Sequence, residues 1–202
     1  LALVISIIVV HLFYVGYVAF SALFFVGLNG WPGYLIWPNN TWLNQIIFPI
    51  CVAFNSLFLS EFTISLLSIQ GKPLRFLRYL ELGVCVSFIS LLFLPYWLAY
   101  GVGIMGLAFI CVISCFIFGS MQWKKGNQAA EYYCLGFAVF VFGVIAMILS
   151  KQGIIPRNAL TEYSVRIGGI IEVCLFSLAL ASKIKALEEE NQANHIKENA
   201  SQ

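Results

Sequence analysis

The stretch EVCLFSLALA at residues 172–181 places one carboxylate, Glu172, inside an otherwise apolar run. It continues without Gly or Pro into SKIKALEEEN at residues 182–191, where charged residues take over. The apolar run from 163 to 184 has about the 20 residues that a membrane-crossing helix needs. The sequence therefore predicts a helix that leaves the bilayer near Lys183 and continues, unbroken, as a charged helix.

Composition places the whole chain in the membrane class. Of its 202 residues, 61% are hydrophobic and only 10% are charged, whereas a soluble domain carries about 25% charged residues. The net charge of +2 is too small to argue for nucleic acid as a partner. The lipid bilayer is the expected partner, and no nucleic acid is expected.

Apolar runs long enough to cross a bilayer cover residues 1–28, 43–69, 79–98, 99–122, 129–150 and 163–184. They lack the period-two alternation of strands, and open sheets cannot cross lipid. The fold class predicted is therefore all-α, a polytopic membrane helix bundle with six clear spans.

The first run is too long for one upright crossing and too short for two. As a helix, its 28 residues would extend about 42 Å, against about 30 Å of hydrocarbon. Either it is one long tilted helix, or residues 1–10 are the remnant of a separate first helix, which would make a seventh span. The chain begins at Leu1 with no Met and no basic segment, which predicts that it is a truncated part of a longer protein and carries no signal peptide.

Basic residues predict the orientation, because Lys and Arg gather on the cytoplasmic side. Because successive spans cross the membrane in opposite directions, the connections that follow the second and fourth runs lie on the same side as the C-terminal tail. That side holds Lys72, Arg75, Arg78, Lys124, Lys125, Lys183, Lys185 and Lys197; the other holds Lys151, Arg157 and Arg166. We expect a multi-pass protein of the bacterial inner membrane with a cytoplasmic C-terminus.

Three polar side chains fall inside the predicted spans. Glu172 lies about 14 Å into the last run, where an ionised carboxylate is costly and needs the bundle interior, a proton or a donor. It is either a coupling point of the bundle or a neutral acid that is hydrogen-bonded for packing. Asn55 is its candidate partner, and Glu61 lies near the inner boundary, within reach of Arg75 or Arg78.

Small residues and cysteines in the runs are interpreted as packing. Gly168 and Gly169 on the last run, and Gly101, Gly103 and Gly106 on the fourth, suit close helix contacts. The six cysteines lie in apolar runs and form no CxxC; Cys111 and Cys115 share a helix face, but zinc would need two more ligands nearby. We expect no metal, no cofactor and no catalytic residues, because His, Cys and acid side chains form no cluster and the chain contains no Asp.

The tail carries a short heptad pattern at Leu180, Ile184, Leu187 and Asn191. Leucines at d and a polar a position are typical of a two-stranded coiled coil, although a solvated charged helix is an equal alternative over two heptads. The predicted organisation is a membrane bundle at 1–184 and a cytoplasmic helical linker at 185–202, with a homodimer as one outcome. The candidate coupling residues are Glu172, Ser177, Lys183, Ile184 and Leu187.

Three stretches together resemble a known bacterial family, the seven-transmembrane receptors with diverse intracellular signalling modules. The first stretch is HLFYVGYVAFSALFFVGLNGWPGYLIWPNNTWLN at residues 11–44, in which Asn29-Gly30 and Trp37-Pro38 followed by Trp42 resemble the outer loop of that family. The second, QGIIPRNALTEYS at 152–164, is similar to its Gly-x-x-Pro-x-Asn connection. The third and most specific stretch begins at Gly168-Gly169, continues through Glu172 and SLALA at residues 177–181, and ends at the basic residue Lys183. The resemblance covers nearly the whole chain but reduces the first helix of the family to residues 1–10.

The resemblance implies a sensor region between an outer, periplasmic sensor domain and a cytoplasmic output module such as a histidine kinase, diguanylate cyclase or phosphatase. Neither attachment is contained in these 202 residues. The receptor hypothesis places contact with the sensor domain or ligand in the outer loop, at Asn29, Trp31, Tyr34, Trp37, Asn39, Asn40 and Trp42. The alternative for the tryptophans is anchoring at the membrane interface alone. The alternative function is a small-solute or proton transporter or channel, which would want several charged residues along a path.

Overall fold

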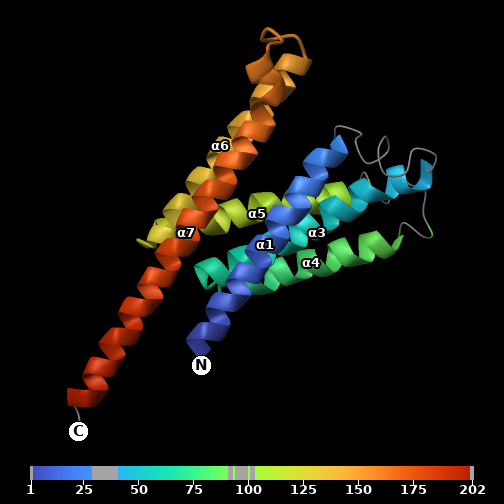
Figure 1. Ribbon diagram of the computed structural model, residues 1–202. Helices are drawn as coiled ribbons and strands as arrows, with labels where there is room; N and C mark the ends of the chain where they lie inside the picture. The colour runs from blue at the N-terminus through green and yellow to red at the C-terminus, as the bar shows by residue number, and fades with distance from the viewer. Residues whose placement is uncertain (1, 29–40, 91–92, 94–99, 101–102, 201–202) are drawn as a thin grey trace. The chain divides into compact units, whose positions relative to one another are not determined.

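The fold is all-α. The computed structural model describes residues 2–28, 41–90, 93, 100 and 103–200. Its helices are α1 (Ala2–Leu28), α3 (Thr41–Leu67), α4 (Lys72–Ser90), α5 (Gly106–Trp123), α6 (Gln128–Lys151) and α7 (Ala159–Ala200) (Figure 1). Within the described residues, five of these helices, α1, α3, α5, α6 and α7, are long and apolar enough to cross a membrane. The predicted helix bundle is confirmed.

Two of the predicted boundaries change. α1 runs unbroken from Ala2 to Leu28, so the structure supports one long helix and not a separate helix in residues 1–10. α4 begins at Lys72, seven residues before the predicted span, so Lys72, Arg75 and Arg78 lie in the first turns of a helix and not in a loop. Pro73 explains the early start, since proline is well tolerated in the first turn of a helix.

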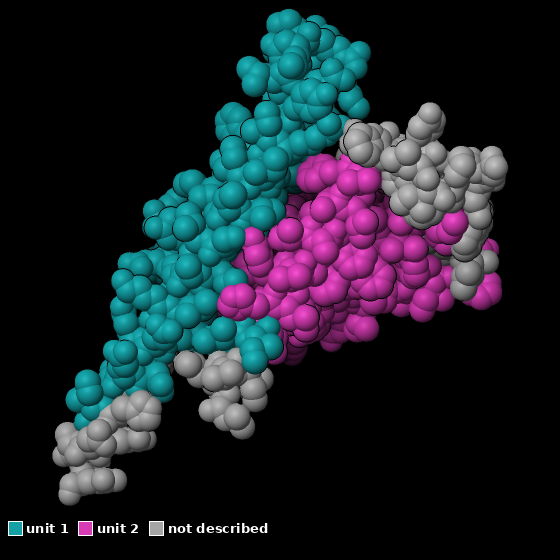
Figure 2. Space-filling view, in the orientation of Figure 1, with its two compact units in different colours: residues 1–8, 119–202 teal, residues 9–118 magenta. Residues whose placement is uncertain are grey.

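The chain divides into two compact units, residues 1–8 with 119–202 and residues 9–118 (Figure 2). In the second unit, α1 and α3 pack through a row of aromatic rings. Phe20 stacks on Phe54 at 4.9 Å between ring centroids, and Tyr14 lies 5.7 Å from Phe62. Rings paired in this way add to the packing that replaces the hydrophobic driving force in lipid.

The first unit is built on a hairpin of α6 and α7, which lie side by side along the length of α6 (Figure 1). Gly153 lies just after the end of α6 and has φ at +77°. The Ile154 amide donates to the Leu149 carbonyl at 3.0 Å. This is the Schellman arrangement, which favours glycine at the left-handed position. Asn158 begins α7: its side chain accepts from the Thr161 amide at 2.9 Å, and Thr161 Oγ1 accepts from the Asn158 amide at 3.0 Å. The Gly-x-x-Pro-x-Asn connection is thus a C-cap followed by a reciprocal N-cap.

Candidate signal-coupling site

α7 is continuous for 42 residues, from Ala159 to Ala200. The unbroken helix that the stretch at 172–191 predicts is therefore confirmed. At about 1.5 Å per residue it is about 63 Å long, roughly twice the thickness of the hydrocarbon core. A helix of this length reaches well beyond the bilayer at one end or both.

Glycines let α6 and α7 approach at backbone distance. A Cβ atom at Gly143 would lie 2.6 Å from the Ser164 carbonyl oxygen, and one at Gly168 would lie 3.2 Å from the Val139 carbonyl oxygen. Ser164 Oγ donates to the Gly143 carbonyl at 2.8 Å. The close contact predicted for Gly168 is confirmed, whereas the contact at Gly143 was not predicted.

Glu172 lies at the middle of this interface. Its side chain is buried, with 2% of the residue exposed, and its carbonyl oxygen would lie 3.4 Å from a Cβ atom at Gly136 of α6. One turn further along α7, Phe176 stacks on Tyr133 at 4.9 Å and packs against Phe137 at 5.6 Å between centroids. Glu172 is thus a buried acid, one helical turn from a buried aromatic cluster of Tyr133, Phe137 and Phe176.

The other predicted coupling residues lie further along α7. Ser177 is exposed and its hydroxyl donates to the Val173 carbonyl at 3.1 Å. Lys183, Ile184 and Leu187 are half-buried. They follow Ala179 and Leu180, which are buried. The coupling residues therefore run from the buried interface into the charged part of α7, and their role stays a prediction.

The two polar residues predicted inside the second span have partners in their own unit. Asn55 Nδ2 donates to Ser21 Oγ on α1 at 2.6 Å. Glu61 forms a salt bridge with Arg78 Nη1 and accepts from Arg78 Nη2 at 3.1 Å. The pairing predicted for Glu61 is confirmed for Arg78. The partner proposed for Asn55 was Glu172, whereas the hydrogen bond that the structure describes is to Ser21.

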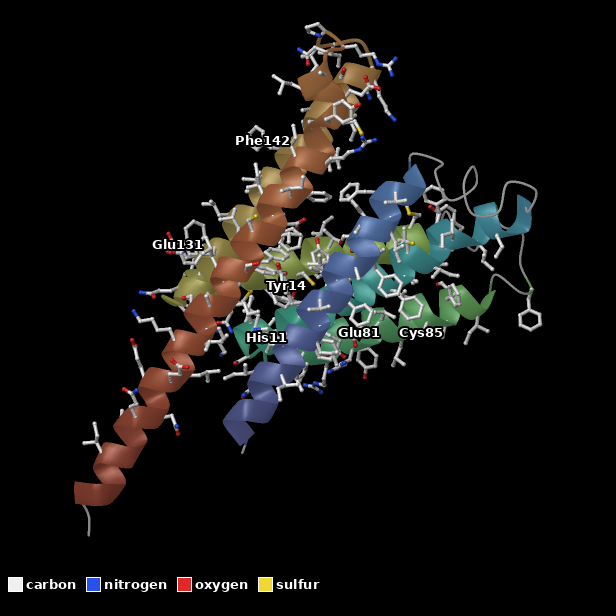
Figure 3. All side chains as sticks on the ribbon, in the orientation of Figure 1. His11, Tyr14, Glu81, Cys85, Glu131 and Phe142 are labelled. Atoms are coloured by element: carbon white, nitrogen blue, oxygen red, sulfur yellow. The ribbon has the colours of Figure 1, made fainter. Side chains whose placement is uncertain are left out.

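Sequence reasoning missed a second carboxylate that shares Arg78 with Glu61. Glu81 on α4 (Figure 3) is buried, and accepts a hydrogen bond from the Ser60 hydroxyl of α3. Its other oxygen accepts from Arg78 Nη1 at 2.9 Å. We call Ser60, Glu61, Arg78 and Glu81 the α3–α4 polar cluster. The i,i+3 spacing of Arg78 and Glu81 is the sequence signal that could have revealed it.

Several predicted positions receive no such support. Six residues of the outer loop, Asn29, Trp31, Tyr34, Trp37, Asn39 and Asn40, lie outside the described residues, as does Gly101; Trp42 falls in the first turn of α3. The close contact expected at Gly106 is wrong for the part of the chain that the structure describes, where nothing lies within 4 Å of a Cβ atom built there. Cys111 and Cys115 are buried, which agrees with their interpretation as packing residues.

The long apolar helices define a polytopic helical membrane protein. A family model described as 7TM diverse intracellular signalling matches residues 8–183. The chain therefore belongs to this family, as the three stretches predicted, and it is the transmembrane sensory region of a signalling receptor. Neither a curated protein nor a solved structure gives a significant match to the chain.

Proposed function

We propose that this region relays a binding event on the outer side of the membrane through α7 to a cytoplasmic signalling module. The observation that carries the proposal is the continuity of α7 from the capped turn at Asn158, past the buried Glu172, to Ala200. A helix without a break transmits rotation or translation from one end to the other. A flexible linker would not.

The distribution of basic residues supports the direction of the relay. With the predicted alternation of the spans across the bilayer, eight Lys and Arg residues fall on the side that includes the end of α7, and three fall on the side of the α6–α7 turn. By the positive-inside rule the C-terminal part of α7 is cytoplasmic and the turn faces outward, in the inner membrane. The physical basis of the relay is two packings of the bundle whose populations shift when an outer ligand binds one of them better.

Insertions in α7 test the relay in the intact receptor. Two residues inserted after Ala186 should change the output severalfold or abolish it, because they rotate everything downstream by about 200°. Seven residues restore the helical phase to within about 20° and should preserve regulation. The measurement is the stimulus-dependent output at matched expression. Equal, normal output from both insertions would show that the tail acts as a passive linker and would overturn the relay.

Glu172 is proposed to set the position of α7 against α6. Glu172→Gln keeps the shape and hydrogen-bonding capacity of the side chain and should retain most of the output. Glu172→Leu removes its polar atoms from a buried position and should shift the basal output severalfold, since it changes the relative free energies of the two packings. Unchanged output from both variants, at equal expression, would remove Glu172 from the mechanism.

A further inference from the structure

The exposed face of α4 changes in character along the helix. Lys72, Arg75, Tyr79, Leu82 and Val86 follow i, i+3, i+7, i+10 and i+14 and are all exposed, Tyr79 by 71% and Val86 by 64%. Side chains at these spacings share one face of a helix. The face therefore passes from two cations through an aromatic hydroxyl to branched aliphatic side chains.

The opposite face of α4 is fixed within its unit. Leu77 and Val84 are buried, Glu81 is bound to Ser60 of α3, and Arg78 joins Glu81 to Glu61. These contacts set the rotation of α4 about its own axis. They hold the face with Lys72 and Arg75 outward.

The cations at the start of α4 differ in how their charges are used. Arg78 is committed to two carboxylates. Lys72 and Arg75 take part in no salt bridge among the described residues, and both are exposed. Two outward cations one turn apart, at the basic end of an otherwise apolar face, complement a phosphate group that carries acyl chains.

We propose that this face binds an anionic phospholipid of the leaflet on the basic side, with its phosphate on Lys72 and Arg75 and its acyl chains along Leu82 and Val86. Leu82 and Val86 lie about 10 and 16 Å further along the helix than Arg75. One leaflet of hydrocarbon is about 15 Å deep, half of the core. Tyr79 falls between the two levels, where aromatic side chains collect at the membrane interface. The spacing of charge, ring and aliphatic groups thus matches the cross-section of one leaflet.

Lipid titration of the full chain in a neutral detergent tests the site. Native mass spectrometry should show saturable binding of phosphatidylglycerol in preference to phosphatidylcholine with the same acyl chains. Lys72→Gln with Arg75→Gln should weaken phosphatidylglycerol binding about thirtyfold, at about a tenfold loss per 1.4 kcal/mol and roughly 1 kcal/mol for each cation near an anionic surface. Each single variant should lose about fivefold, which provides a measurement if the double variant is poorly folded.

The matched control is Lys124→Gln with Lys125→Gln, which removes the same charge from the exposed turn that follows α5. This pair should leave the affinity for phosphatidylglycerol within about twofold of the parent. An equal loss in both double variants would mean attraction by net charge alone and would overturn the proposal. Equal binding of the two lipids by the parent chain would overturn it as well.

Discussion

Replacement of Gly143 by alanine should lower the free energy of unfolding by about 2–3 kcal/mol, the upper part of the range for overpacking. The added Cβ atom would lie 2.6 Å from the carbonyl oxygen of Ser164 and 3.1 Å from its carbonyl carbon. Both are backbone atoms of α7, so no side chain can rotate away to make room. The two helices must separate locally, which also strains the hydrogen bond from Ser164 Oγ to the Gly143 carbonyl.

Gly106→Ala is the matched control for this experiment. Among the described residues, nothing lies within 4 Å of a Cβ atom at Gly106, and alanine is the better helix former by about 1 kcal/mol. The control should therefore be neutral or slightly stabilising. The measurement is reversible unfolding of the chain in bicelles, for parent and both variants. A Gly143→Ala variant as stable as the parent would contradict the backbone contact between α6 and α7.

In the proposed relay, a loss of stability at Gly143 would change signalling, because the same interface holds Glu172. Gly136, Gly143 and Gly168 let the backbones of α6 and α7 interlock at successive turns. An interface of this kind has few intermediate positions, since sliding brings backbone against backbone. A helix pair that is held in this way favours movement of α7 between discrete positions over continuous sliding.

Features that depend on neighbouring residues were predictable from the sequence. The turn from Gly153 to Asn158 combines a residue for positive φ with an N-cap, and both act within a few residues. The continuity of α7 follows from the lack of Gly and Pro after Gly169. Glu61 and Arg78 could be paired because they flank a short connection between antiparallel runs.

Features that depend on distant partners were not predictable. Gly143 lies in the ordinary apolar run VFVFGVIAM, and its importance comes from the backbone of Ser164, 21 residues away. Glu81 looks like the polar start of a span until Ser60 of α3 is placed beside it. Gly106 shows the reverse error, because a glycine in an apolar run marks a close contact only when another helix packs at that point.

The α3–α4 polar cluster should be strongly coupled, and Arg78→Gln should cost about 2 kcal/mol of stability. The substitution leaves Glu81, whose side chain is 11% exposed, and the neighbouring Glu61 without the cation between them. Removal of one partner from a fully buried pair costs about 3–5 kcal/mol. Arg78 is 47% exposed, and solvent screening reduces the expected value.

A double-mutant cycle with Glu81→Gln separates the pairwise interaction from the cost of each change. Glu81→Gln keeps an acceptor for the Ser60 hydroxyl and should cost about 1 kcal/mol, the typical net contribution of one hydrogen bond. If the side chains interact directly, the double variant should lose less than the sum of the two, with a coupling energy of about 1 kcal/mol or more. Arg75→Gln, one turn earlier and exposed, should change stability by less than about 0.5 kcal/mol. All four variants are compared with the parent by unfolding in phosphatidylcholine bicelles, so that the phospholipid proposed for Arg75 does not contribute. Strict additivity would show that Arg78 and Glu81 do not interact directly, and an equal loss for Arg75→Gln would show that the cost at Arg78 does not come from the α3–α4 polar cluster.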